Sequence, residues 1–115
     1  MNSVMYQTRM LNREIKHSNE YNQYLRTLQR LREKPELYAR TKEFQKRSMV
    51  LQCTADYNTL DEMGRLRSEY QDILNNPLVS DFLGAEQRVM GMLRRVEDAL
   101  FDGVDLAVDI LDDWE

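Results

Sequence analysis

The chain has 115 residues, of which 42% are hydrophobic and 31% charged, and its formal net charge is −4. Four glycines and two prolines are too few for a β-sandwich or barrel, which needs a turn about every 8–12 residues. No apolar run approaches the roughly 20 residues of a membrane-spanning helix, and no hydrophobic targeting segment stands at the start. The single cysteine, Cys53, excludes an internal disulfide framework, so we expect a cytoplasmic protein with one helical domain over residues 1–115.

The charges are unevenly distributed along the chain. Residues 1–50 hold 11 Lys/Arg and 5 Asp/Glu, residues 51–101 hold 5 and 9, and residues 102–115 hold six acids and no cation. Such a split is typical of a basic arm that binds nucleic acid, or of two halves that face each other when the chain folds back or pairs. We favour the second interpretation because the basic residues are scattered rather than clustered.

Residues 1–34 carry apolar side chains at intervals of three and four, which predicts helical structure. Ser18 is a typical N-cap residue, so this stretch is either one helix or two helices that meet near residue 18. Pro35 ends the stretch, because proline cannot continue a helix but fits the first turn of the next one.

The same spacing predicts helices over residues 35–56 and 59–75. Thr59 and Glu62 have the spacing of a capping box, with Thr59 as the N-cap. Asn76 and Pro77 then predict the N-cap and the first turn of another helix.

The last predicted helix, residues 77–111, would be roughly 50 Å long at 1.5 Å per residue, and it is followed by an acidic end at residues 112–115. Two rows of apolar side chains, which we call seams, run side by side along it. The first seam and the apolar positions of the middle helices predict a core of Leu37, Phe44, Leu51, Met63, Tyr70, Leu78, Phe82, Val89 and Val96. The second seam predicts an interface of Val79, Leu83, Met90, Leu93, Leu100, Val104, Ala107 and Leu111.

Together the two seams make an apolar stripe wider than a two-stranded coiled coil requires. A compact chain of this length has a radius of gyration near 13 Å, so it covers such a rod poorly. A second copy is the simplest cover, although residues 1–34 could cover the rod if they formed one unbroken helix. We therefore expect an all-α antiparallel bundle of about four to five helices with a long C-terminal helix, paired as a homodimer.

The sequence offers little material for catalysis or metal binding. His17 and Cys53 are the only histidine and the only cysteine, whereas a structural zinc site or an iron–sulfur cluster needs about four such ligands. No nucleophile, base and orienting group can be assembled from these residues. We expect no catalytic residues, no cofactor and no metal.

One succession of residues is similar to a known family. It runs Ile15-x-x-Ser18-x-Glu20-Tyr21-x-x-Tyr24, Pro35-Glu36-Leu37, Glu43-Phe44 and Asn76-Pro77-Leu78-Val79-x-x-Phe82-Leu83-x-Ala85-Glu86. In order and spacing it resembles the YlbF family of small bacterial helical proteins, over nearly the whole chain. The segment that begins at Asn76 is the most specific part of the resemblance.

The resemblance implies an all-α regulator without catalytic activity that pairs with itself or with relatives. Its best understood members form a complex that modulates RNase Y, a membrane-anchored endoribonuclease, and so affect mRNA maturation, competence, sporulation and biofilm formation. Some members hold iron–sulfur clusters on cysteines, but no cysteine follows Cys53 here, so the cluster is not carried over. The function expected is a regulator or adaptor that acts through helix-mediated protein contacts. The alternative is an RNA-binding helical protein that uses the basic first half.

Overall fold

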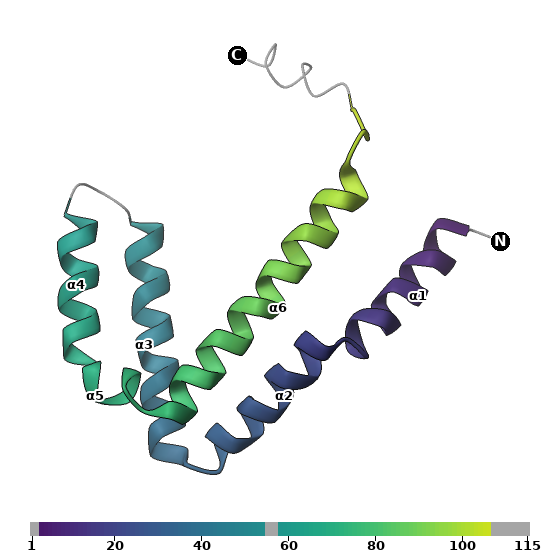
Figure 1. Cartoon of the computed structure of the whole chain (residues 1–115). Coiled ribbons are helices and arrows are strands. Elements are labelled where there is room, and N and C mark those ends of the chain that lie inside the picture. The colour runs from purple at the N-terminus through teal and green to yellow at the C-terminus, as the bar shows by residue number, and fades with distance from the viewer. Residues whose placement is uncertain (1–2, 55–57, 107–115) are drawn as a thin grey trace.

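The computed structural model describes residues 3–54 and 58–106, and within these residues it contains helices and no strand. The helices are α1 (Ser3–Lys16), α2 (Asn19–Arg32), α3 (Pro35–Cys53), α4 (Thr59–Glu69), α5 (Gln71–Leu74) and α6 (Pro77–Phe101). Figure 1 shows them as two arms that meet at one end: α3 and α4 form a hairpin, and α2 runs antiparallel to α6. The all-α prediction with a long C-terminal helix is confirmed.

Residues 3–34 contain two helices, α1 and α2, which decides between the two possibilities that the sequence left open. Ser18 is the N-cap of α2, and its side-chain oxygen accepts a hydrogen bond from the backbone N–H of Tyr21 at 3.1 Å. Its extended backbone, with ψ 152°, interrupts the helical path between α1 and α2. Beyond the break α1 continues in roughly the direction of α2, and the α1–α2 arm opens away from α6 toward the N-terminus (Figure 1).

The helix predicted over residues 59–75 begins at Thr59 as predicted, but it is divided into α4 and α5, and its N-cap is Asn58 rather than Thr59. Asn58 is the N-cap of α4, because its carbonyl already accepts the bond from the N–H of Glu62, at 3.0 Å; Thr59 is therefore helical and not the cap of a capping box. Tyr70, with φ −105° and ψ 17°, separates α4 from α5. The break coincides with the burial of the Tyr70 side chain, which is 2% exposed.

The long helix begins as predicted and ends earlier than predicted. The Asn76 side chain accepts a hydrogen bond from the backbone N–H of Leu78 at 2.9 Å, and Pro77 occupies the first turn. The helix ends at Phe101 rather than at residue 111, because Asp102 is extended and Gly103 has φ +76°, a conformation that glycine adopts readily. Residues 107–111 of the prediction lie outside the described residues.

The core lies where the two arms meet. Its fully enclosed side chains include Leu31 of α2 and Val79 and Phe82 of α6, each 0% exposed. The rings of Phe82 and Tyr24 lie 5.7 Å apart, so the contact joins α6 to α2. Of the predicted core, the buried members are Phe44, Tyr70, Phe82 and Val89; Leu37, Leu51, Met63 and Leu78 are partly buried against it, and Val96 is half-buried farther along α6.

Replacement of Phe82 by alanine tests whether this side chain lies at the centre of the core. We expect Phe82→Ala to lower the free energy of unfolding by about 3–5 kcal/mol, because the side chain is fully enclosed and the cavity cannot fill completely. Leu60→Ala is the matched control: Leu60 is 86% exposed, so its loss should change stability by less than about 0.5 kcal/mol. Urea unfolding at one fixed protein concentration measures both. An effect of Phe82→Ala as small as that of the control would contradict the proposed core.

Candidate protein-interaction surface

A single chain of this protein is flat and extended. Its principal extents are 50 × 42 × 17 Å. The radius of gyration is 19.0 Å, whereas a compact domain of this length has about 13 Å. The chain exposes 9460 Å², against about 6,600 Å² for a compact folded protein of the same mass. A single chain is therefore far from compact.

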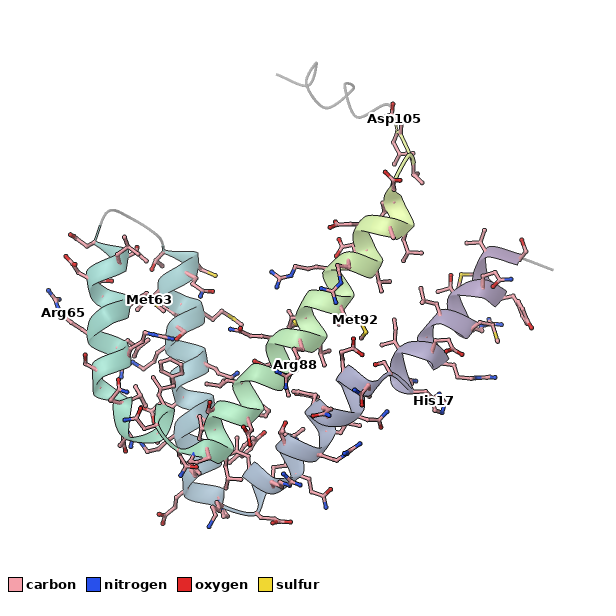
Figure 2. The ribbon with its side chains drawn as sticks, in the orientation of Figure 1. His17, Met63, Arg65, Arg88, Met92 and Asp105 are labelled. Atoms are coloured by element: carbon pink, nitrogen blue, oxygen red, sulfur yellow. The ribbon has the colours of Figure 1, made fainter. Side chains whose placement is uncertain are left out.

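The apolar side chains of α6 are more exposed along its outer half than along its inner half. Val79, Phe82 and Ala85 are 0% exposed, Leu93 is 38% exposed and Leu100 is 55% exposed. The inner half of the helix packs on α2 and α5, whereas α1, which extends the α2 arm, makes no comparable contact with the outer half (Figure 1). Figure 2 shows the Met92 side chain on the side of α6 that faces the α1–α2 arm.

The first helix shows the same pattern. It has 14 residues and none of them is buried, although its apolar residues have helical spacing. Leu11 and Ile15, near the break, are half-buried, while Tyr6 is 52% exposed. An isolated helix of this length is marginal in water, so it needs packing on one face. We call the exposed apolar side chains of these two helices the open surface; they are Val4, Met5 and Tyr6 of α1 and Met90, Leu93, Leu100 and Phe101 of α6.

The predicted interface residues divide into three groups. Val79 is in the core, which corrects its prediction as an interface residue: α2 and α5 enclose the first turns of α6 and bury both seams there. Leu83 is partly buried against the core. The exposed members are Met90, Leu93, Leu100 and Val104, and the remaining two, Ala107 and Leu111, lie outside the described residues.

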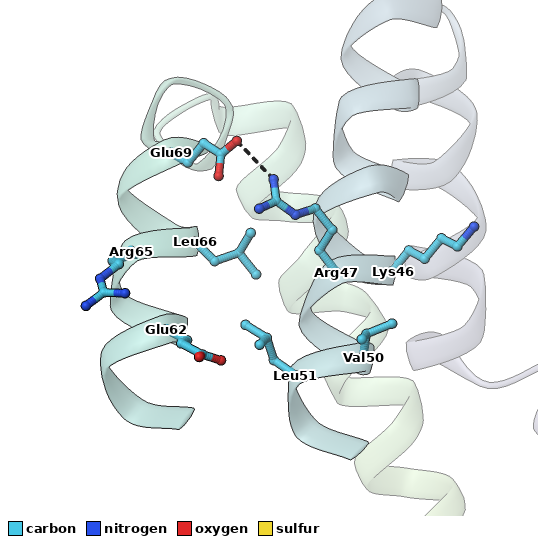
Figure 3. Close-up of a pocket in the computed structure, with 8 residues that line it drawn as sticks. All are labelled: Lys46, Arg47, Val50, Leu51, Glu62, Arg65, Leu66 and Glu69. Carbon is cyan, nitrogen blue, oxygen red and sulfur yellow. Dashed lines mark hydrogen bonds and ion pairs between the residues drawn. The ribbon is translucent and has the colours of Figure 1, made fainter. Parts of the chain in front are cut away.

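A second candidate surface is a groove between α3 and α4, with a volume of about 540 Å³ (Figure 3). Val50, Leu51 and Leu66 supply its apolar lining, and the charged residues around it are Lys46, Arg47, Glu62, Arg65 and Glu69. The Arg47 guanidinium donates a hydrogen bond to the Glu69 carboxylate at 2.9 Å, which links the two helices. This bond lowers the pKa of Glu69 below its ordinary value.

Tyr70 joins the two helices of the hairpin more deeply. Its hydroxyl donates a hydrogen bond to the Glu43 carboxylate at 2.5 Å and accepts one from Arg47 at 3.2 Å. The guanidiniums of Arg40 and Arg47 lie over its ring, 5.0 and 5.5 Å from the centroid. The hydrogen bond to Glu43, followed by burial, raises the pKa of Tyr70 above its ordinary value of 10.0. The cluster therefore favours a neutral tyrosine and holds α3 against α4 and α5.

This cluster was missed from the sequence, which predicted Tyr70 only as an apolar core residue. Arg40 also forms an ion pair with Asp72. Both ion pairs, Arg40–Asp72 and Arg47–Glu69, join a cation of the basic first half to an acid of the following segment. They form because α3 packs against α4 and α5. This agrees with the interpretation of the charge distribution in which the basic and acidic parts of the chain face each other.

The two residues considered for chemistry lie apart. His17 is exposed at the break between α1 and α2, where its Nδ1 lies 2.8 Å from the Arg13 carbonyl, and Cys53 is exposed at the end of α3 (Figures 1 and 2). Among residues 3–54 and 58–106, no group of three or more His, Cys, Asp or Glu side chains is placed to hold a metal ion.

None of the helices in that part of the chain is both long and apolar enough to cross a membrane.

Comparison with known proteins places the chain in a family. A family model described as "Control of competence regulator ComK, YlbF/YmcA" matches residues 4–105. The chain belongs to the YlbF/YmcA family. The match covers all six helices apart from the first residue of α1, and it confirms the resemblance seen in the sequence. No curated protein and no solved structure matches the chain.

The raised pKa of Tyr70 gives the stability of this YlbF/YmcA protein a predicted dependence on pH. The folded state holds the phenolic proton more tightly than the unfolded state does, so this stabilisation is complete below pH 10 and is lost as the pH rises through the folded-state pKa. We expect urea unfolding to show a stability that falls above pH 10. In Tyr70→Phe, stability should be lower at pH 8 but should fall less steeply above pH 10.

Tyr6→Phe is the control, because Tyr6 is 52% exposed. This substitution should leave the loss of stability above pH 10 unchanged. If Tyr70→Phe and the wild type lost stability in parallel between pH 8 and pH 11, the Tyr70–Glu43 hydrogen bond would not be the source of the effect.

Proposed function

We propose that this chain is a non-enzymatic cytoplasmic regulator that acts as an adaptor through helix-mediated protein contacts, and that it pairs with itself. The observation that carries the proposal is the open surface of α1 and the outer half of α6. Family membership supports a role in competence control. The partners we propose beyond the second copy are other family members and an RNase Y-type ribonuclease complex that processes mRNA.

The amount of exposed surface supports self-pairing. The chain exposes 9460 Å², which is about 2,900 Å² more than a compact protein of its mass. Obligate homodimer interfaces bury about 2,000–5,000 Å² in total over the two partners. Per chain this is about 1,000–2,500 Å², so pairing would cover between a third and most of the excess, and it would pack a second layer of helices against the open surface.

RNA binding by the basic first half is the alternative. Two of its arginines, Arg40 and Arg47, are engaged with Asp72 and Glu69, which reduces the charge available for phosphates. A gel shift with single-stranded RNA over a series of salt concentrations separates the two functions, because phosphate contacts weaken steeply with salt. We expect no shift at low salt; a salt-sensitive shift would support the alternative.

The state of association tests self-pairing. Light scattering over a concentration series should give a mass about twice the 13.8 kDa of one chain. Leu100→Glu should raise the dissociation constant at least tenfold, a change equivalent to about 1.4 kcal/mol, because it buries a charge at the interface. Leu60→Glu, at a more exposed position outside the open surface, should leave the mass unchanged. A mass of one chain at every concentration would overturn self-pairing.

The ribonuclease link needs its own measurement. Purified chain should bind the soluble part of an RNase Y-type ribonuclease saturably and shift its cleavage pattern on a structured mRNA. Absence of binding, with a chain that remains dimeric, would contradict the ribonuclease link and leave self-pairing intact.

A further inference from the structure

We propose that two copies pair by exchanging their first helices, so that α1 of each copy lies against the outer half of α6 of the other. The inference rests on the self-pairing proposed above and specifies which surfaces meet. It commits the open surface to one occupant, a second copy of this chain.

The two helical segments match in length. Helix α1 has 14 residues and therefore spans about 21 Å, and residues 90–101 of α6 span about 18 Å. Each has a row of apolar side chains that becomes more exposed with distance from the junction of the arms: Ile15 is half-buried and Tyr6 is 52% exposed in α1, as Val89 is 8% and Leu100 is 55% exposed in α6. One segment is thus long enough to cover the other.

The geometry of the chain itself directs α1 outward. Ser18 caps α2 with an extended backbone, and beyond it α1 diverges from α6 of its own chain (Figure 1). Leu93 and Leu100, on the outer half of α6, are 38% and 55% exposed, so no second layer of helices covers them within one chain. A second copy related by a two-fold axis supplies that layer, and each α1–α6 contact then occurs twice.

The charges of the two segments are complementary. Helix α1 carries Arg9, Arg13 and Lys16 against one acid, Glu14. Beyond Arg95, the described part of α6 and its following residues carry only acids, namely Glu97, Asp98, Asp102 and Asp105. Acids near the C-terminal end of a helix are disfavoured by its dipole, and cations from a second copy would offset that cost.

Crosslinking between copies tests the exchange. All variants carry Cys53→Ser, which removes the only native thiol. One preparation has Leu11→Cys, near the middle of α1, and a differently tagged preparation has Val96→Cys, near the middle of the outer half of α6. The two are mixed through unfolding and refolding, then treated with a short bis-maleimide. Because each chain has one cysteine, every crosslink joins two chains, and mid-to-mid positions meet whether the helices run parallel or antiparallel.

We expect an efficient crosslink between Leu11→Cys and Val96→Cys chains. As the control, a chain with native Cys53, at the end of α3, should crosslink poorly to Val96→Cys. A dominant crosslink from Cys53 would make the α3–α4 hairpin the occupant. A dimer that gives only Val96→Cys homodimeric crosslinks, or none, would also overturn the exchange while leaving self-pairing intact. A chain that is monomeric by mass would overturn both.

A charge-reversal pair gives a second, independent readout. Arg13→Glu should raise the dissociation constant of the dimer about threefold to tenfold, since a weak surface contact is lost twice by symmetry. Mixing it with Asp98→Lys chains should restore the affinity in the mixed dimer. Equal weakening in the mixed dimer and in the Arg13→Glu dimer would show that these helices do not meet.

Discussion

The burial of the inner half of α6 is the interaction on which the rest of the structure depends. Its first turns pass between α2 and α5, and Val79 and Phe82 are fully enclosed there. The hydrogen bond between the Gln45 side chain and Glu86, at 2.6 Å, adds a link from α6 to α3. Because the packing is concentrated at this end, both arms are anchored at one end and diverge at the other. Local stability should fall along each arm toward its tip.

The two arms are held together by different physical means. The α2–α6 arm relies on apolar burial and on aromatic contact, whereas the α3–α4 hairpin adds the polar cluster around Tyr70. A buried hydroxyl that is fully hydrogen-bonded fixes the relative position of its helices more narrowly than apolar packing does, because a displaced partner leaves a buried polar group unsatisfied. The cluster around Tyr70 therefore fixes how α3 lies against α4 and α5, whereas the outer half of α6 has no such polar contact to fix a neighbour.

Local signals predicted the helix boundaries that depend on neighbouring residues. Ser18, Pro35 and Asn76 act over two to four residues, so their effects can be read from the sequence. The break at Tyr70 accompanies the burial of its side chain and its hydrogen bond to Glu43, 27 residues away, and no spacing rule reveals such a contact. Val79 was assigned to an interface because the two seams of α6 look alike in sequence; only the placement of α2 and α5 decides which part of each seam is enclosed.

The end of α6 at Phe101, before its predicted end, also depends on packing between distant parts of the chain. It affects the surface that the chain presents to a partner. Apolar residues continue at helical spacing past Phe101, yet a helix needs a covered face to be stable, and the described residues 102–106 are all exposed. The same holds for α1, whose 14 residues include no buried side chain. If pairing supplies the cover, the stability of both segments rises with protein concentration by mass action. The surface that such a regulator presents would then depend on how much of it the cell contains.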